Sequence, residues 1–145
     1  MVVASRRVAD SATGDLEADL RAAIGGEVRF DSVTRQMYST DASIYQMDPV
    51  GVVIPRNADD VSAVLEIAAR NDVSVLPRGG GTALSGQTVN HAVVIDFSKY
   101  MFEVREINSE EQWVRTQPGI TIDDLNRQLR PSGLFFTPDP STSSR

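Results

Sequence analysis

The chain has 145 residues, a length that suits one domain with one hydrophobic core. Its hydrophobic content of 41% and charged content of 23% are ordinary for a globular protein. The net charge of -6 argues against nucleic acid as the main partner, because phosphate backbones are bound by basic surfaces. Since there is no cysteine, disulfides, thiolate metal sites and a cysteine nucleophile are excluded within this chain.

No apolar run approaches the roughly 18–20 residues of a transmembrane segment, and the start does not have the pattern of a secretory signal. A cytoplasmic location is therefore the default expectation. Residues 1–13 are polar and small, and we expect a flexible N-terminus there, followed by a domain over residues 14–145.

The first predicted helix covers residues 15–24, because Leu16, Leu20 and Ile24 recur at spacings of four. Two glycines follow, and we expect them to end this helix in a left-handed cap. Residues 28–30 are predicted to form a short extended piece. Residues 37–49 are predicted to be irregular chain or short turns.

A strand–helix–strand unit is predicted next. Residues 52–54 form an apolar run closed by Pro55, as for a buried strand, and Asn57 can cap the helix that follows. Residues 73–76 are predicted to be a second buried strand, joined to the first by a right-handed parallel crossover. A glycine-rich loop follows this strand directly, which is where ligands bind in open α/β sheets.

Residues 92–97 predict a third strand, and residues 102–107 and 112–117 predict a pair of strands joined by a turn. Thr121 is expected to cap a last helix, with Asp124 in a loose capping box. The expected fold class is α+β (α/β-like): a small sheet with a β-α-β parallel unit, added strands and flanking helices.

The loop over residues 77–87 carries three successive glycines, so its backbone can approach a ligand closely and its N–H groups can converge on an anion. Thr82 and Ser85 add hydroxyl donors, and Gly86 gives a second flexible point. Arg78 offers a fork of donors to a phosphate, although its side chain could equally face solvent or a carboxylate.

Other interpretations of this loop are less consistent with its sequence. A flexible surface turn would not require Thr, Ser and Gln at defined points between two strands. A P-loop needs Gly-Lys-Ser/Thr at its end, which is absent, and the dinucleotide-binding glycine pattern fails at Leu84.

Five blocks, in order, resemble a known family: residues 52–56 with 59–61, residues 77–87, residues 92–100, residues 117–119, and residues 133–136 with 138–142. From about Gly26 onward the chain is similar to the N-terminal part of the FAD-binding domain of FAD-linked oxidases, the vanillyl-alcohol oxidase and para-cresol methylhydroxylase (PCMH) superfamily. Within it, residues 30, 38–43 and 96–100 most resemble bacterial D-2-hydroxyacid dehydrogenases of the long D-lactate or D-2-hydroxyglutarate type.

The resemblance implies non-covalent FAD, held by a pyrophosphate loop, a turn against the flavin and a segment along the cofactor near its ring. In that order, the implied residues are Arg78, Gly79, Gly80, Gly81, Thr82, Ala83, Leu84, Ser85, Gly86 and Gln87; Pro118 and Gly119; and Pro138, Asp139, Pro140, Ser141 and Thr142. In such enzymes the flavin takes a hydride from the hydroxyl-bearing carbon of a D-2-hydroxy acid such as D-lactate, glycolate or D-2-hydroxyglutarate.

The family's catalytic residues, substrate domain and iron–sulfur ligands would lie beyond Arg145, so no catalytic or metal-binding residue is assigned here. We expect a truncated, inactive part of a larger oxidoreductase, whose whole form could be membrane-peripheral. One alternative is a non-catalytic remnant that folds, binds FAD weakly or not at all, and self-associates through an unfinished flavin face. Another is an acidic module that binds a different diphosphate.

Several other residues are interpreted structurally. His91, the sole histidine, is expected to have a surface or capping role, and no histidine precedes the loop where covalent flavin attachment would need one. Trp113 is expected to pack on a strand. Asp123 with Asp124 is expected to be a helix-start charge pair, and Asp41 and Asp139 are expected to lie in turns.

Overall fold

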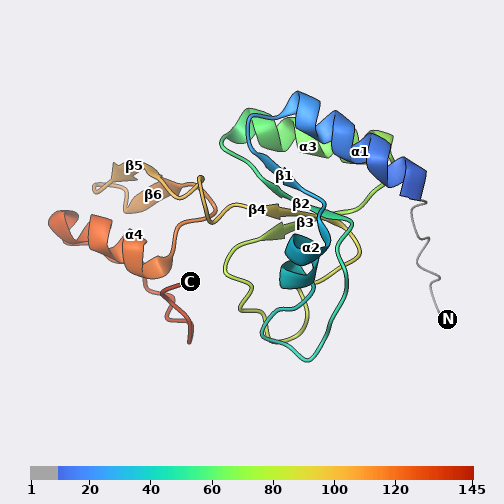
Figure 1. The fold of residues 1–145 in the computed structure, drawn as a ribbon. Coiled ribbons are helices and arrows are strands. Elements are labelled where there is room, and N and C mark those ends of the chain that lie inside the picture. The colour runs from blue at the N-terminus through green and yellow to red at the C-terminus, as the bar shows by residue number, and fades with distance from the viewer. Residues whose placement is uncertain (1–9) are drawn as a thin grey trace.

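The computed structural model describes residues 10–145 (Figure 1). Most of the predicted flexible N-terminus, residues 1–9, lies outside the described residues. In chain order the elements are α1 (Asp10–Ala23), β1 (Glu27–Arg29), α2 (Ser32–Tyr38), β2 (Gly51–Ile54), α3 (Ala58–Arg70), β3 (Val75–Arg78), β4 (Val93–Asp96), β5 (Val104–Asn108), β6 (Trp113–Thr116), α4 (Ile122–Leu129) and the short 3-10 helix η1 (Arg130–Ser132).

The main sheet has four strands in the order β1-β2-β4-β3, with β1 antiparallel to β2 and the other pairs parallel. The predicted β-α-β unit is therefore present as β2-α3-β3, but its two strands are not neighbours. Strand β4 lies between them, with Val94 opposite both Val52 and Leu76. The carboxyl ends of β2, β3 and β4 consequently share one edge of the sheet.

Helices α1 and α3 lie together over one face of this sheet, and α2 lies on the opposite side (Figure 1). The larger core cluster lies under α1 and α3, because both helices direct their apolar stripes at the strands. Its buried members are Leu16, Leu20, Val28, Val50, Val53, Val64, Ile67, Val93 and Ile95. On the other face Val52, Ile54 and Val94 are covered by Leu76 and by two tyrosines, Tyr38 and Tyr100.

Three local expectations differ from the structure. Helix α2 was not predicted, because it has no buried residue and so shows no apolar period; it is capped by Asp31, which accepts a hydrogen bond from Thr34 N. Gly25 does not adopt a left-handed cap, and its N–H instead donates to the Asp60 carboxylate at 2.9 Å. Strand β3 was expected to be buried but is a half-buried edge strand, which is why it accommodates Pro77.

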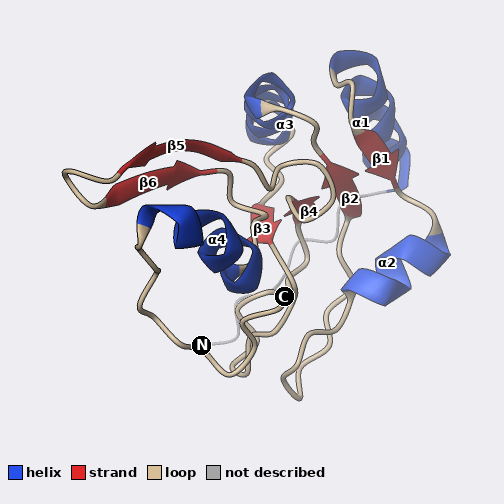
Figure 2. Ribbon diagram, turned by 90° about the vertical axis from the view of Figure 1, so that its left-hand side faces the viewer, coloured by secondary structure: helices blue, strands red, loops and turns tan. Residues whose placement is uncertain are grey.

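A second, smaller lobe follows the sheet (Figure 2). Strands β5 and β6 form the predicted antiparallel pair, and α4 packs beside them with Leu125 and Leu129 buried. The predicted cap of α4 is confirmed, since Thr121 accepts a hydrogen bond from Asp124 N. Among the described residues, no helix is both long and apolar enough to cross a membrane.

Candidate anion-binding loop

The glycine-rich loop leaves the carboxyl end of β3 and returns to β4 at the sheet edge where three parallel strands end. Gly79 and Gly80 are exposed, and a side chain at Gly79 would meet no other atom. Gly81 and Gly86 have φ angles of 65° and 77°, a backbone region that side chains disfavour. Gly79 thus leaves the backbone uncovered at one point, and Gly81 and Gly86 allow two left-handed bends.

Most amides of this loop have no acceptor within the described chain. Within residues 10–145, the N–H groups of residues 79–84 donate no hydrogen bond to any backbone or side-chain acceptor. Among residues 79–87 of the described chain, only the Ser85 amide has a partner, since it donates to Gln87 Oε1 at 3.2 Å. Successive backbone donors without partners at the end of a strand are the elements of an anion-binding nest.

Arg78 binds three backbone carbonyls on either side of the loop. Its Nη1 donates to the carbonyl oxygens of Tyr38 at 3.2 Å and Thr88 at 2.9 Å, and its Nη2 donates to the carbonyl oxygen of Thr40 at 2.8 Å. The guanidinium also lies 5.2 Å from the centroid of the Tyr38 ring. Three donors of Arg78 therefore serve protein carbonyls, a role that the sequence did not indicate beside a phosphate, solvent or a carboxylate.

Asp41 links the segment after α2 to the residue that follows the loop. Its carboxylate accepts hydrogen bonds from Ser43 N at 2.9 Å and from the Thr88 hydroxyl at 2.9 Å. Bonds from Ser43 and then Thr88 lower the pKa of the Asp41 carboxyl to about 2, against the opposing effect of desolvation. The neighbouring Ala42 N donates to the Gly81 carbonyl at 3.2 Å. The turn role expected for Asp41 is present, and it extends to anchoring the glycine loop.

Tyr38 connects these anchors to the sheet. Its hydroxyl donates to Asp96 Oδ2 at 2.5 Å, and Asp96 lies at the end of β4 and is buried. Burial and the acidic partner both raise the pKa of Tyr38 well above its ordinary value, so the phenol stays protonated. Tyr38, Asp41 and Asp96 were not among the predicted site residues, although all three lie in segments that carried the family resemblance.

The predicted turn at Pro118 and Gly119 lies close to the same sheet edge. Gly119 N donates to the Met101 carbonyl at 2.8 Å, and a Cβ at Gly119 would overlap the Phe97 carbonyl. Phe97 N in turn donates to the Arg78 carbonyl at 3.2 Å, at the start of the glycine loop. A close approach of two backbone segments therefore explains this glycine without a ligand.

The C-terminal segment also approaches the loop. Residues 138–141 are exposed, and Ser143 accepts a hydrogen bond from Asp123 N at the start of α4. A side chain at Gly80 would contact Arg145, so the tail passes directly beside the glycine loop. The structure thus places Arg145 beside the predicted loop, while the predicted residues 138–142 have no such contact described.

The remaining polar candidates have structural partners. His91 Nδ1 lies 3.0 Å from the Asp48 carbonyl, while its buried Nε2 has no partner in the described part of the chain. Trp113 lies half-buried on β6 and donates from its ring N–H to Glu111. Asp124 binds Arg127 and Thr121 at the helix start, as the charge-pair interpretation expects. No acidic or histidine cluster suited to a metal ion occurs among residues 10–145.

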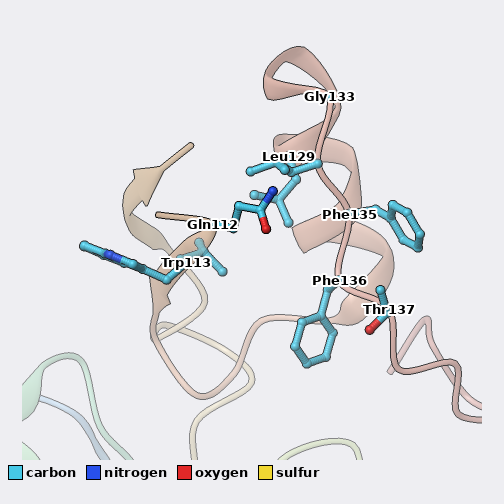
Figure 3. A pocket seen from close by; sticks show the side chains of 9 residues that line it. Gln112, Trp113, Leu129, Gly133, Phe135, Phe136 and Thr137 are labelled. Atoms are coloured by element: carbon cyan, nitrogen blue, oxygen red, sulfur yellow. The ribbon is translucent and has the colours of Figure 1, made fainter. Parts of the chain in front are cut away.

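A separate hollow lies between β6 and the segment after α4 (Figure 3). It has a volume of about 370 Å³, and its walls include Trp113, Leu129 and Phe136. Sequence reasoning missed it, because it depends on how the tail folds back. The adjacent aromatic pair Phe135 and Phe136, both exposed, was the signal that could have indicated it.

The chain matches a known protein family over most of its length. The family described as FAD binding domain matches residues 49–145, about two thirds of the sequence. This chain belongs to the FAD-binding domain family. The match includes the glycine loop, the Gly119 turn and the tail, and it confirms the resemblance that the five sequence blocks indicated.

Relatives within the family are hydroxy-acid oxidoreductases by name. A D-2-hydroxyglutarate dehydrogenase of Pseudomonas putida is 44% identical over 133 residues, which cover 90% of this chain and 13% of the relative. A glycolate oxidase subunit GlcD of Bacillus subtilis is 38% identical over 124 residues, covering 82% of this chain and 26% of that protein. The chain therefore spans between about an eighth and a quarter of the length of these relatives.

Solved structures share the fold at lower identity. A 4-ethylphenol oxidase of Gulosibacter chungangensis has a TM-score of 0.77 at 23% identity, over 87% of this chain and 26% of that one. A p-cresol methylhydroxylase has a TM-score of 0.69 at 17% identity, over 88% of this chain and 26% of that one. These likenesses confirm the expected fold, that of the first part of a PCMH-type FAD-binding domain.

Proposed function

We propose that this chain supplies the pyrophosphate-binding part of an FAD site. The supporting observation is the run of loop amides at residues 79–84 that have no acceptor within the described residues, at the carboxyl edge of a parallel sheet. Membership of the FAD-binding domain family makes the diphosphate of FAD the anion that best fits this nest.

The residues present fit such a group. Gly79 presents open space where a side chain would block the approach of a diphosphate, whereas the side-chain directions of Gly80 and Gly81 are occupied by Arg145 and by the Arg78 guanidinium. Thr82 and Ser85 add hydroxyl donors, whereas Arg78 and Gln87 act on the loop itself. In the proposed site, Pro118 and the segment 138–142 border the cofactor beyond the diphosphate.

The names of the relatives favour a D-2-hydroxy acid as the substrate of a longer protein that contains this domain. FAD, when bound, supplies the acceptor for the hydride that leaves the hydroxyl-bearing carbon. The residues described here bind and orient the cofactor, and the catalytic residues belong to other parts of that protein. An iron–sulfur region there, and a cytoplasmic location, remain predictions.

The direct test is thermal unfolding of the chain with FAD, ADP or riboflavin. A ligand at 100 times its dissociation constant stabilises a protein by about 2.7 kcal/mol. We expect FAD to raise the melting temperature, ADP to raise it less, and riboflavin, which lacks the diphosphate, to have the least effect. Stabilisation by riboflavin without any by ADP would contradict a diphosphate-binding loop. Equal stabilisation by ADP and FAD would favour the alternative of a module for another diphosphate.

Exposed aromatic residues favour a second candidate property, which is self-association. Phe135 is 69% exposed and Phe136 is 42% exposed beside the hollow of the second lobe. Apolar surface of this kind is commonly covered by a partner. In this alternative the chain associates through that surface, and light scattering should show a mass above 15.8 kDa that falls in a Phe135→Ser variant.

A further inference from the structure

The geometry points to Arg78 as a positioning residue, which shapes the glycine loop before any ligand arrives, and not as a ligand of the phosphate. This inference rests on the proposed function only for its consequence on FAD affinity. Its structural part, an ordered loop in the ligand-free chain, can be tested separately.

The first observation is where the three acceptors of Arg78 come from. Tyr38 ends α2 and Thr40 follows it, whereas Thr88 comes directly after the glycine loop. One guanidinium at the start of the loop therefore connects the loop's end to a segment some forty residues earlier in the chain. Hydrogen bonds from a charged donor are stronger than neutral ones, and the planar fork fixes their directions.

The second observation concerns the donors that Arg78 has left. A guanidinium has five N–H groups, and the carbonyls of Tyr38, Thr40 and Thr88 use three of them. The remaining side is covered by the loop, because a Cβ at Gly81 would overlap Nη2 and lie 3.0 Å from Nε. The guanidinium thus fills the side-chain direction of Gly81, and at least three of its five donors already have protein acceptors, so it acts on the loop itself.

The third observation is a second anchor with the same purpose. Asp41 binds the Thr88 hydroxyl and amide, and the Ala42 amide binds the Gly81 carbonyl. The loop is therefore held at its start, near its middle and at its end, while the amides of residues 79–84 stay without acceptors in the described chain. A site held in its binding geometry loses less conformational entropy on binding, which strengthens affinity without any new contact.

The test compares Arg78→Lys with Arg78→Gln. Lysine keeps the positive charge, so it would retain much of the affinity if Arg78 attracted the phosphate, but its single ammonium cannot replace the planar fork. The measurement is backbone ¹⁵N relaxation of residues 79–88 in the ligand-free chain, followed by FAD titration. We expect order parameters of about 0.85 in the wild type and below about 0.6 in both variants. FAD affinity should fall by at least about tenfold in both.

Two control variants separate the effect of Arg78 on the loop from the general effects of a substitution. Arg105→Gln removes an exposed arginine of β5 that pairs with Glu103, and it should change neither the loop nor the affinity. Tyr38→Phe removes the hydroxyl bond to Asp96 but keeps the carbonyl and ring that contact Arg78, so its effect on the loop should be smaller than that of Arg78→Lys.

Either of two results would overturn the inference. One is a loop that remains as ordered in Arg78→Lys and Arg78→Gln as in the wild type. The other is FAD affinity that Arg78→Lys restores although the loop is mobile, which would assign Arg78 to the phosphate. If the wild-type chain binds no FAD, the proposed function fails, but the relaxation data still decide whether Arg78 orders the loop.

Discussion

At the scale of single residues, the glycines of this chain serve two different purposes. Gly79 has no neighbour in the direction of a side chain, so its value is the access it gives to the backbone. Gly119 is the opposite case, because a Cβ there would overlap the carbonyls of Phe97 and Met101. In the proposed site the first glycine serves binding, whereas the second serves packing, although both lie in blocks that the family resemblance assigned to the cofactor.

The two glycines should respond differently to substitution by alanine. Gly119→Ala forces two backbone segments apart, and we expect it to lower the free energy of unfolding by about 2–3 kcal/mol. Gly79→Ala adds a methyl group in open space and should change stability by less than about 0.5 kcal/mol. Urea denaturation of both variants checks this, and equal losses of stability would contradict the assignment of separate purposes.

Glu27 makes the stability of the fold depend on pH. Lys99, Tyr100 and Arg29 all donate to its carboxylate, and these bonds lower the pKa of Glu27 from 4.5 to about 2. A carboxylate with a lowered pKa in the folded state stabilises the fold above the unfolded pKa, and this stabilisation is lost as the pH falls toward the folded pKa.

The melting temperature should therefore fall as the pH is lowered from about 4.5 to about 2, and Glu27→Gln should make that fall shallower. The matched control is Glu110→Gln, in the exposed turn after β5, which should leave the profile unchanged. Parallel profiles for the wild type and Glu27→Gln would show that the ion cluster around β1 contributes no stability.

At the scale of elements, a single buried carboxylate joins three of them. Asp60 lies in the first turn of α3 and accepts hydrogen bonds from Gly25 N, after α1, and from Arg56 N, after β2. The cap of α3 comes from Asn57, whose side chain accepts from Asp60 N. The contacts of Asp60 therefore fix how α1, β2 and α3 meet at one corner of the sheet.

Asp60→Ala should consequently be costly, since it leaves two amides without acceptors at a buried position. We expect a loss of about 2–4 kcal/mol, because each unsatisfied buried group costs about 1–3 kcal/mol and some gain access to water. Asp59→Ala is the control, because Asp59 occupies the same first turn but is exposed. If circular dichroism melting shows the two variants to be alike, Asp60 does not have this joining role.

The sequence predicted those elements whose signal is local. The apolar run at β2, the cap and period of α3, and Thr121 before α4 each depend on neighbouring residues, and each is present. Helix α2 escaped prediction, because Val33 and Met37 are exposed and its one strong signal, the Asp31 cap, stands alone. The position of β4 between β2 and β3 also escaped, because strand order depends on contacts distant in sequence.

In the candidate site, too, the features with a local signal were predictable and those that depend on distant contacts were not. The glycines and hydroxyls of the loop were predictable, because their residue types alone favour an uncovered, donor-rich backbone. The partners of Arg78 were not, because the carbonyls of Tyr38 and Thr40 belong to a segment about forty residues earlier in the chain. A backbone carbonyl has no sequence signature, so the structure was needed to show what Arg78 binds.

At the scale of the whole molecule, the sheet edge, the segment after α2 and the C-terminal tail surround the glycine loop (Figures 1 and 2). Arg145 lies beside Gly80, and Ala42 binds Gly81, so both flanks of the loop are formed by parts of the chain distant in sequence. The fold thus leaves one stretch of backbone amides without acceptors in the described chain while it fixes the residues on either side of them.

The central claim is that this stretch of amides binds the diphosphate of FAD, and calorimetric titration of FAD into the wild-type chain and Gly79→Leu tests it most directly. A leucine at position 79 has room to fold but would occupy the space that the diphosphate needs. We predict saturable binding at one site in the wild type. In Gly79→Leu, binding should be at least about tenfold weaker, equivalent to about 1.4 kcal/mol, with an unchanged melting temperature. Equal FAD affinity in the two proteins, or no binding by the wild type, would contradict the claim.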